Sequence, residues 1–244
     1  MSAPPTSDHD EFAHSLREQG FRFVAGAEMR GHLLEHGSLQ DWDAFADSWN
    51  DLAPDVYLAQ VGRHRRRRHA VFHALRDGAI ERRPHQPHYQ SLNYNSLQGD
   101  IERWFEPVRD DIAQGESLQT VLGFCRDFFS ALAPQTTAWH IELHQFRIEA
   151  GPDNEGQPTP EGVHRDGVDY VLVLLIDRHN IVSGTTTIHD RDGSLLGSFT
   201  LTAPLDAALV DDARVFHGVT AVTPQDPTCE AHRDVLVVTF KAAS

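Results

Sequence analysis

The second half of the chain decides the fold, because it contains short apolar segments such as WHIELHQFRI (139–148), YVLVLLI (170–176) and RDVLVVTF (233–240). Runs of this length that are bounded by turn residues are typical of strands. We predict eight strands, at 139–148, 163–168, 170–176, 185–190, 195–201, 207–210, 215–222 and 233–240, with a tight hairpin turn at Asp192-Gly193. Eight short strands without intervening helices favour a jelly roll or barrel over a parallel α/β sheet.

The first half of the chain is predicted to be mainly helical. Short helices are expected at 8–19, at about 27–36 and after a cap at Ser38, and an amphipathic helix at 117–133 ends before Pro134. Extended segments are expected at 56–61 and 65–74, and a polar loop at 81–100. The predicted fold class is α+β: a double-stranded β-helix core, jelly-roll or cupin-like, at about 136–241, with flanking N-terminal helices at about 8–135. We expect a flexible leader at 1–7 and a single domain at 8–244, because no internal repeat or long linker is present.

The composition argues against several classes of function. With 21 Lys+Arg against 36 Asp+Glu, the net charge of −15 disfavours binding to nucleic acid or to an anionic membrane. No apolar run approaches the roughly 20 residues of a membrane span, and MSAPPTSDHDEF at the N-terminus lacks the features of a secretory signal. The lone cysteines Cys125 and Cys229 form no CxxC motif, which favours a reducing cytoplasm.

The strongest candidate for chemistry is the HRD motif at 164–166, followed later by His217. Alternate residues of a strand face the same side, so we expect His164 and Asp166 to point together into the barrel. Two imidazoles and one carboxylate form the facial triad of non-haem Fe(II) oxygenases, which leaves metal positions open. Arg233 heads an otherwise apolar strand and needs an anionic partner, which a dicarboxylate cosubstrate would supply. The alternative is that Arg233 pairs with a structural aspartate and that the histidines are surface residues.

Two further regions are candidates for ligand contacts. Gln145 and Arg147 alternate on the strand before the HRD motif; if that face is the pocket, Gln145 would contact the cosubstrate and Arg147 a substrate carboxylate. An ion pair at the barrel rim is the alternative for Arg147. The polar loop at 88–98, with His88 and Tyr94, is a candidate lid or substrate wall, or else an ordinary turn-rich loop.

Other motifs have simpler explanations. His32 and His36 match the HxxEH pattern of zinc proteases, but Gly37 ends the helix at once, and histidine is favourable near a helix C-terminus. The DRDG segment at 190–193 lacks the glycine and glutamate positions of an EF-hand and is predicted to be a hairpin. The arginines at 63 and 65–68 have no interleaved aromatics, so we expect ion pairs or a contact with a partner subunit, which leaves a homo-oligomer open.

The order HxD, His and Arg on a β-rich C-terminal half resembles the Fe(II)/2-oxoglutarate-dependent dioxygenases. Within them the chain is most similar to the bacterial L-isoleucine 4-hydroxylase-like group, which hydroxylates free amino acids. The resemblance covers roughly residues 56–240 and is carried by GRHRRRRH (62–69), HYQSLNYNSLQGDIERWFEP (88–107), HQFR (144–147), PTPEGVHRDGVDYV (158–171), SGTTTIHD (183–190), LVDDARVFHGVTAV (209–222) and HRDVLVVTF (232–240).

The resemblance implies a cofactor set and a reaction. His164, Asp166 and His217 would bind Fe(II), and Arg233 would hold the distal carboxylate of 2-oxoglutarate, with O₂ as cosubstrate and ascorbate as a reductant in vitro. 2-Oxoglutarate would be decarboxylated to succinate and CO₂. Because Asp166 is present where halogenating relatives have a small residue, the resemblance favours hydroxylation over halogenation.

The leading hypothesis is therefore hydroxylation of an aliphatic carbon of a free L-amino acid similar to isoleucine, leucine or methionine. The alternatives are desaturation or cyclisation with the same cofactors, a carrier-bound substrate, a cupin-type metal enzyme without 2-oxoglutarate, and a non-catalytic jelly-roll binding module. A metal enzyme that does not use 2-oxoglutarate would have no evident need for Arg233 at the head of the last strand. A binding module predicts no affinity for Fe(II).

Overall fold

The order of helices and strands comes from a computed structural model that describes residues 8–60, 62–63, 65–92, 94–95, 97 and 99–243, the first four by their backbone alone. The predicted leader at 1–7 lies outside these residues. The described helices all precede residue 133, and the chain from Ala138 onward is built of strands and their connections. The described helices therefore lie in the first half of the chain, which also contains strands such as Arg66–Leu75.

The helices of the described chain are mostly short. They are α1 (Asp8–Gln19), α2 (Gly26–His36), α3 (Trp42–Asp47), the 3-10 turn η1 (Ser48–Asp51), α4 (Val56–Ala59), α5 (Asp110–Ala113) and α6 (Glu116–Leu132). The longest, α6, follows the predicted apolar spacing, and its Leu118, Val121 and Phe129 are fully buried. No helix among the described residues is long and apolar enough to cross a membrane.

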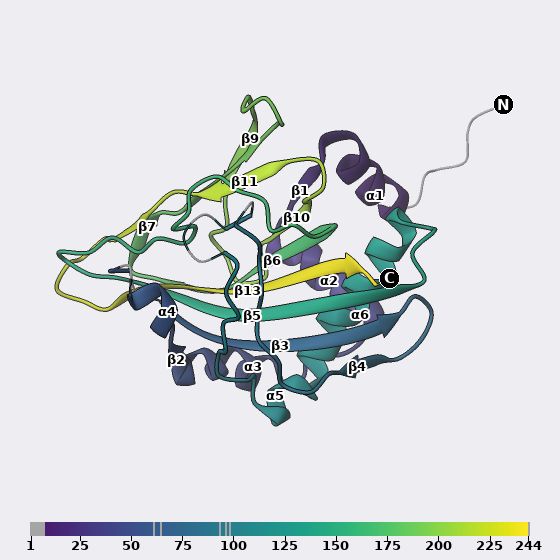
Figure 1. The fold of residues 1–244 in the computed structure, drawn as a ribbon, viewed down its shortest axis with the longest axis horizontal. Coiled ribbons are helices and arrows are strands. Elements are labelled where there is room, and N and C mark those ends of the chain that lie inside the picture. The colour runs from purple at the N-terminus through teal and green to yellow at the C-terminus, as the bar shows by residue number, and fades with distance from the viewer. Residues whose placement is uncertain are drawn as a thin grey trace.

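The strands form one large antiparallel sheet and two small ones (Figure 1). The large sheet has the order β1-β10-β6-β13-β5-β3-β2, and β4 pairs with β3; the small sheets are β11-β8-β9 and β12-β7. The strands are β1 (Phe21–Val24), β2 (Ala53–Pro54), β3 (Arg66–Leu75), β4 (Ile80–Arg82), β5 (Ala138–Ala150), β6 (Tyr170–His179), β7 (Ile181–Ser183), β8 (Thr185–His189), β9 (Leu195–Thr200), β10 (Ala207–Asp211), β11 (Phe216–Val219), β12 (Val222–Pro224) and β13 (Ala231–Ala242).

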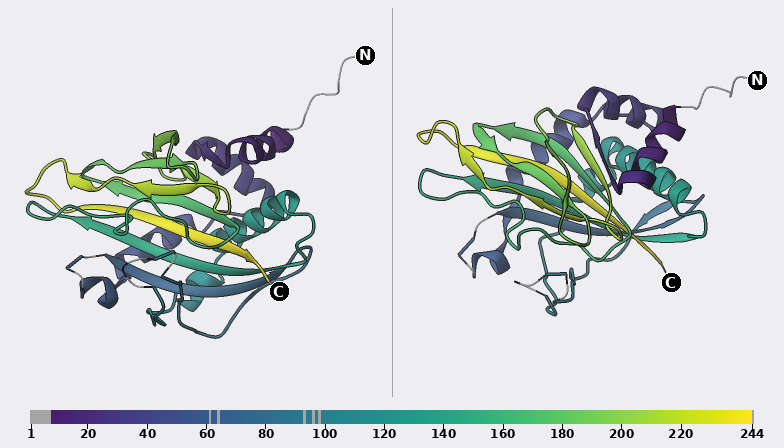
Figure 2. Two further views of the ribbon diagram at one scale, coloured as in Figure 1. Left: turned by 45° about the horizontal axis from the view of Figure 1, so that its top comes forward. Right: turned by 90° about the horizontal axis from the view of Figure 1, so that it is seen from above.

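The two faces of the large sheet have different roles. On one face, alternate residues of β5 such as Trp139, Ile141 and Leu143 form a core with apolar residues of α1, α2 and α6, which lie together on that side of the sheet (Figure 2). On the opposite face, apolar side chains such as Val171 and Val235 pack in two smaller clusters with residues of the small sheets and their connections. The helix-covered face is therefore the stabilising core, and the other face is available for a pocket.

The segment at 163–168 corrects one predicted strand. Among its residues only His164 pairs with a strand, through mutual backbone hydrogen bonds of 2.9 Å with His217 on β11. The carboxylate of Asp212 instead accepts hydrogen bonds from the backbone N–H groups of Asp166, Gly167 and Val168. Since those donors are taken by a side chain, the segment cannot continue as a strand.

Three other predictions of secondary structure were also wrong. The segment at 56–61 is not extended, because the Asp55 carboxylate accepts the Leu58 N–H at 3.0 Å and caps α4; position 61 lies outside the described residues. Ser38 does not begin a helix, since α3 begins at Trp42. The predicted strand at 215–222 is divided into β11 and β12.

The arginine-rich segment of β3 forms the ion pairs that were one of its two expected roles. Arg65 and Arg67 contact Asp55, Arg66 contacts Glu149 and Arg68 contacts Asp51. Both cysteines are free thiols, as expected for a chain without a disulfide framework.

Candidate active site

A pocket opens on the sheet face that the helices leave uncovered. Its floor is formed by alternate residues of the long strands: Val171 and Val173 of β6, Arg233, Val235, Val237, Thr239 and Lys241 of β13, and His140, Glu142, His144, Phe146 and Ile148 of β5. The rest of its lining comes from Leu58, Arg65 and Arg67, from described residues between 88 and 103 and between 158 and 168, and from His217 and Val219 of β11. The pocket therefore joins the HRD motif, the last strand and the polar loop, which lie far apart in the sequence.

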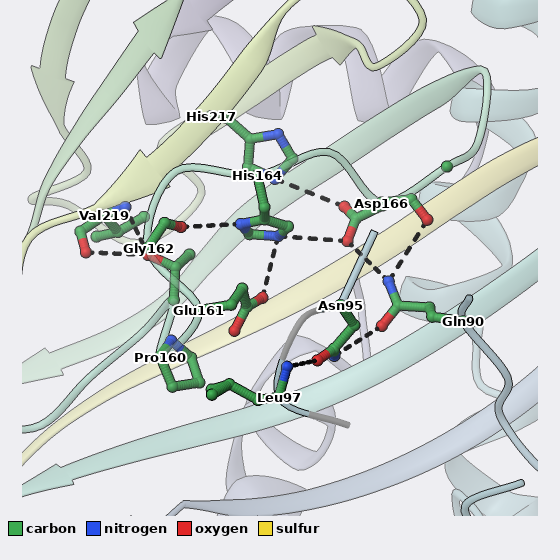
Figure 3. A network of polar contacts seen from close by, with 12 residues as sticks. Gln90, Asn95, Leu97, Pro160, Glu161, Gly162, His164, Asp166, His217 and Val219 are labelled. Atoms are coloured by element: carbon green, nitrogen blue, oxygen red, sulfur yellow. Dashed lines mark hydrogen bonds and ion pairs between the residues drawn. The ribbon is translucent and has the colours of Figure 1, made fainter. Parts of the chain in front are cut away.

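His164, Asp166 and His217, which we call the triad, meet inside this pocket (Figure 3). The Asp166 carboxylate lies 3.5 Å from Nε2 of His164 and 3.5 Å from Nε2 of His217. One potential ligand atom from each residue lies within 4.8 Å of the other two. The backbone pairing of the two histidines places their ring centroids 4.7 Å apart. The structure thus brings together the three side chains that the sequence pointed to.

A fourth residue, Asp212, fixes the position of the triad. It is fully buried and accepts the N–H groups of Asp166 at 2.9 Å, Gly167 at 2.8 Å and Val168 at 3.1 Å. Its Oδ1 also lies 3.8 Å from Nδ1 of His217. A carboxylate next to the outer nitrogen of a histidine is the usual way in which proteins orient an imidazole metal ligand.

The electrostatics of the triad favour a positive charge at its centre. Burial lowers the pKa of His164, but the hydrogen bond and charge of Asp166, together with the charge of Glu161, outweigh burial and raise this pKa to about 9. Burial raises the pKa of Asp166, but His164 and His217 outweigh burial and hold it below its usual range. Burial and the neighbouring His164 lower the pKa of His217 to about 4. An anionic carboxylate thus faces two imidazoles, a donor set that suits Fe(II).

Arg233 lies on the same pocket floor and has an unmet need for an anion. Its side chain is 2% exposed, and its Nε and Nη2 have no hydrogen-bond partner among the described residues. Burial and the neighbouring Arg178 lower its pKa to about 10. Asp234 is not its partner, because that carboxylate pairs with Arg147. A buried guanidinium with unpaired N–H groups fits the carboxylate of 2-oxoglutarate.

A second group of potential metal ligands, His69, His88, Glu142 and His144, lines the same pocket or lies just behind it. The Glu142 carboxylate accepts hydrogen bonds from His69 at 3.0 Å and His88 at 2.5 Å. Nδ1 of His144 lies 2.6 Å from Nη2 of Arg67, and a guanidinium can only donate. The ring proton of neutral His144 must then sit on Nε2, which leaves that ring no lone pair for a metal. We therefore interpret this group as a polar pocket wall.

A third group of potential ligands contains Asp177, His232 and Asp234. Asp234 already forms a two-pronged ion pair with Arg147, at 2.8 and 2.6 Å, and Asp177 is exposed. The triad is the better candidate for iron, because its carboxylate has no arginine partner among the described residues.

Of the two loop residues singled out from the sequence, the pocket includes one. His88 lines it, next to Glu142. Tyr94 is not part of the lining; its ring packs against Gly167, so closely that an added Cβ there would lie 2.6 Å from the ring. Gly167 also has a φ of +80°, so glycine is needed at this position for two reasons.

The expectation that Gln145 and Arg147 face the pocket was wrong. Both share the face of Trp139 and Leu143, which is covered by the helical half of the chain. Gln145 is 1% exposed and donates to Oγ of Ser48 at 2.8 Å. Arg147 pairs with Asp234, so the ion-pair alternative holds for this residue.

Sequence spacing does not reveal residues whose role depends on the tertiary fold. Asp212 lies in the DDARVFH segment, close to His217, but a buried carboxylate cannot be distinguished there from an exposed one. Glu161 lies in the PTPEGVH segment, and its Oε1 is 3.2 Å from Nε2 of His164 (Figure 3). The polar residues at 140, 142 and 144 were a usable signal, since they alternate with the apolar core positions of β5.

Comparisons with known proteins agree with this site. Residues 46–239 match the family model described as 2OG-Fe dioxygenase. The chain is 24% identical over 240 residues to 3(1)-hydroxy-L-isoleucine 4-dioxygenase of Pantoea ananatis, and the match covers 95% of each protein. It is 29% identical over 158 residues to L-isoleucine-4-hydroxylase of Bacillus thuringiensis, and the match covers 63% of this chain and 64% of that protein.

Solved structures show the same similarity. The crystal structure of a bsmA homolog from Methylobium petroleophilum superposes with a TM-score of 0.87 at 36% identity, over 100% of this chain and 96% of that one. IDO from Bacillus thuringiensis superposes with a TM-score of 0.75 over 100% of both chains, at 19% identity.

Members of this family use Fe(II), 2-oxoglutarate and O₂. The residues of the pocket fit both Fe(II) and 2-oxoglutarate. The triad offers two imidazoles and a carboxylate within reach of one ion, and Arg233 offers an unpaired buried guanidinium to the cosubstrate. The family model matches most of the chain, including all four of these residues. The chain therefore belongs to the 2OG-Fe dioxygenase family and is a 2-oxoglutarate-dependent dioxygenase.

Proposed function

We propose that the protein hydroxylates an aliphatic carbon of a free L-amino acid similar to isoleucine, leucine or methionine. The observation that carries this proposal is a pocket that holds the triad and Arg233 next to both apolar and charged side chains. The names of two similar proteins, 3(1)-hydroxy-L-isoleucine 4-dioxygenase and L-isoleucine-4-hydroxylase, support the same class of substrate. The single domain at 8–244 would contain a double-stranded β-helix, formed by the large sheet and the facing small sheets.

The residues would divide the work as follows. His164, Asp166 and His217 would hold Fe(II), and Arg233 would hold the distal carboxylate of 2-oxoglutarate through paired hydrogen bonds. When bound, the iron and its cosubstrate supply the oxidising power, with decarboxylation of 2-oxoglutarate to succinate and CO₂. The protein contributes position and environment, and Asp212 keeps the loop that carries Asp166 in one conformation.

The pocket floor near the triad suits an aliphatic carbon chain. Valine side chains from three strands line the pocket, namely Val171, Val173, Val219, Val235 and Val237. Apolar walls exclude water from reactive groups and offer dispersion contacts to methyl and methylene groups. A strongly polar substrate side chain would lose its hydration there without compensation.

The test is a panel of free L-amino acids incubated with the protein, Fe(II), 2-oxoglutarate and ascorbate. We expect at least one aliphatic or sulfur-containing amino acid to gain the mass of one oxygen atom, with one succinate formed per product. A product that loses two hydrogen atoms would indicate desaturation or cyclisation and contradict hydroxylation. If no free amino acid gives a product coupled to succinate, the proposal is wrong and a carrier-bound or peptide-bound substrate is indicated.

A further inference from the structure

The β3 side of the pocket carries a second set of buried guanidinium groups. Arg65, Arg67 and Arg103, which we call the arginine group, all line the pocket. Arg67 and Arg103 are 2% and 1% exposed. Burial and the charge of Arg65 lower the pKa values of both, so the three positive charges lie close enough to oppose one another.

Arg65 and Arg67 share the carboxylate of Asp55, and Arg103 donates to Oε1 of Gln90 at 3.1 Å. Asp55 accepts from Nε of Arg65 at 2.8 Å and lies 3.6 Å from Nη1 of Arg67. Glu142, on the neighbouring strand, accepts instead from His69 and His88. Arg65 and Arg67 thus have one carboxylate between them at contact distance, and a bound anion would give Arg67 a closer partner of its own.

Arg67 is held rigidly in this wall. Its guanidinium lies 3.5 Å from the ring centroid of Phe105 and 4.6 Å from that of Phe146, and Nη2 contacts His144. Its Nε is buried and has no hydrogen-bond partner among the described residues. A guanidinium fixed in orientation with a free donor is well suited to a carboxylate, since little side-chain entropy is lost on binding.

Arg233 and the arginine group are separate sites. Arg233 lies on β13 and Arg67 on β3, with β5 between these strands, which puts their backbones about 10 Å apart. If Arg233 holds the cosubstrate, the arginine group is left for a second anionic ligand in the same pocket. That ligand is most simply the substrate.

Glu161 supplies the complementary negative charge. Its Oε1 contacts Nε2 of His164, the ring atom within reach of the Asp166 carboxylate (Figure 3). Glu161 itself lines the pocket, as the arginine group does. Its carboxylate lies near enough to Arg103 for its charge to oppose the lowering of the Arg103 pKa.

We propose that the pocket recognises the zwitterionic head of a free amino acid, with the α-carboxylate on the arginine group, chiefly Arg67, and the α-ammonium on Glu161. This inference rests on the proposed hydroxylation of a free amino acid and adds the residues that select it. Both charges of the head are then required, so an amide or thioester at the carboxyl end and an acyl group on the amine are rejected. The side chain of the amino acid is directed to the valines beside the triad.

The first experiment changes the ligand and leaves the protein intact. Protein loaded with Fe(II) and 2-oxoglutarate is titrated without oxygen, by calorimetry, with L-isoleucine, L-leucine and L-methionine, and with the carboxamide and the N-acetyl derivative of each. We expect both derivatives to bind about tenfold more weakly or worse than the parent, because each leaves a charged protein group without a partner. Equal affinity for the free amino acid and either derivative would overturn the inference.

The second experiment assigns each charge to its residue. Glu161→Gln should weaken binding of the free amino acid and remove the discrimination against the N-acetyl derivative, while that against the carboxamide remains. Arg67→Lys and Arg103→Gln should reduce discrimination against the carboxamide alone. Thermal unfolding shows which variants are folded. If Arg67→Lys does not fold, the titrations of the unaltered protein with the derivatives still test the head-group inference.

Matched controls come from the same segments. Arg66 is a half-exposed arginine on β3 that pairs with Glu149, and Glu155 is an exposed glutamate near Glu161 in the sequence. Arg66→Gln and Glu155→Gln should leave the affinities for all the ligands unchanged. If a free amino acid is hydroxylated but its derivatives bind equally well, only the head-group inference fails. If no free amino acid binds or reacts, the proposed function fails and this inference fails with it.

Discussion

The buried carboxylate of Asp212 accepts the backbone N–H of Asp166 at 2.9 Å, across 46 positions of sequence. Two further N–H groups of the same loop bind the other oxygen of this carboxylate. The loop that carries Asp166 is therefore organised by a side chain near His217 and not by strand pairing.

Asp212→Asn tests this relationship. Asparagine keeps one acceptor oxygen and replaces the other by a donor that faces backbone N–H groups, so the loop should lose its fixed conformation. We expect the affinity for Fe(II) to fall by about 10- to 100-fold, the usual cost of removing a residue that orients a metal ligand. Equilibrium dialysis with Fe(II) without oxygen measures it, with Asp211→Asn as the adjacent control. An unchanged affinity would show that Asp212 does not position the site.

Arg233→Gln tests the cosubstrate site. The variant removes the positive charge that the buried, unpaired guanidinium offers to a carboxylate. We expect the KM for 2-oxoglutarate to rise about 30-fold or more, with a smaller rise for Arg233→Lys, which keeps the charge but not the two-pronged geometry. Steady-state succinate formation measures both constants. A KM for Arg233→Gln within error of the wild-type value would exclude Arg233 from cosubstrate binding.

Arg147→Ala tests the face of β5 that the sequence interpretation misassigned. Asp234 is 1% exposed, so the variant leaves a buried carboxylate without its partner. We expect the free energy of unfolding to fall by about 3 kcal/mol, while the KM values for 2-oxoglutarate and the amino acid stay unchanged. Urea unfolding and steady-state kinetics measure the two effects. A large rise in either KM at unchanged stability would show that Arg147 contacts a ligand in the pocket.

Burial of His69 predicts that stability depends on pH. Burial lowers the pKa of His69 from 6.5 to about 4, although Glu142 partly opposes the shift. Between these pH values the unfolded chain binds a proton that the folded chain does not. Stability is therefore full above about pH 6.5 and falls as the pH drops towards 4, by about 3 kcal/mol from this residue.

Urea unfolding at about pH 7 and about pH 4.5 measures this loss. His69→Gln can still donate to Glu142 but does not titrate, so its stability should fall less over the same range. The same loss of stability in the variant and the wild type would show that His69 is not the titrating group.

The strands could be predicted because their signal is local. The runs around Leu143, Val173 and Val237 have strand composition, and each lies in a strand of the large sheet. The segment at 163–168 was also predicted to be a strand, yet a distant carboxylate takes three of its N–H groups. The short helix α4 was missed for a similar reason, because the cap at Asp55 outweighs the β-branched residue that follows it.

Residues of the candidate site could be predicted where the proposed chemistry itself demands a residue type. His164, Asp166, His217 and Arg233 stood out because a metal and a carboxylate need those groups, and all four line one pocket. The face assignment of Gln145 failed, since alternation gives two faces but does not say which one the helices cover. Glu161 and Arg67 become visible only when loops and strands are placed next to one another.

The most direct test of the central claim compares the wild type with Asp166→Ala in one assay. With Fe(II), 2-oxoglutarate, O₂ and the preferred amino acid, succinate and singly oxygenated product are both quantified, and Asp153→Ala on the exposed loop serves as the control. We predict equal amounts of succinate and product for the wild type and the control, and neither for Asp166→Ala. Coupled turnover by Asp166→Ala at the wild-type rate, or a wild type that forms product without succinate, would contradict the account.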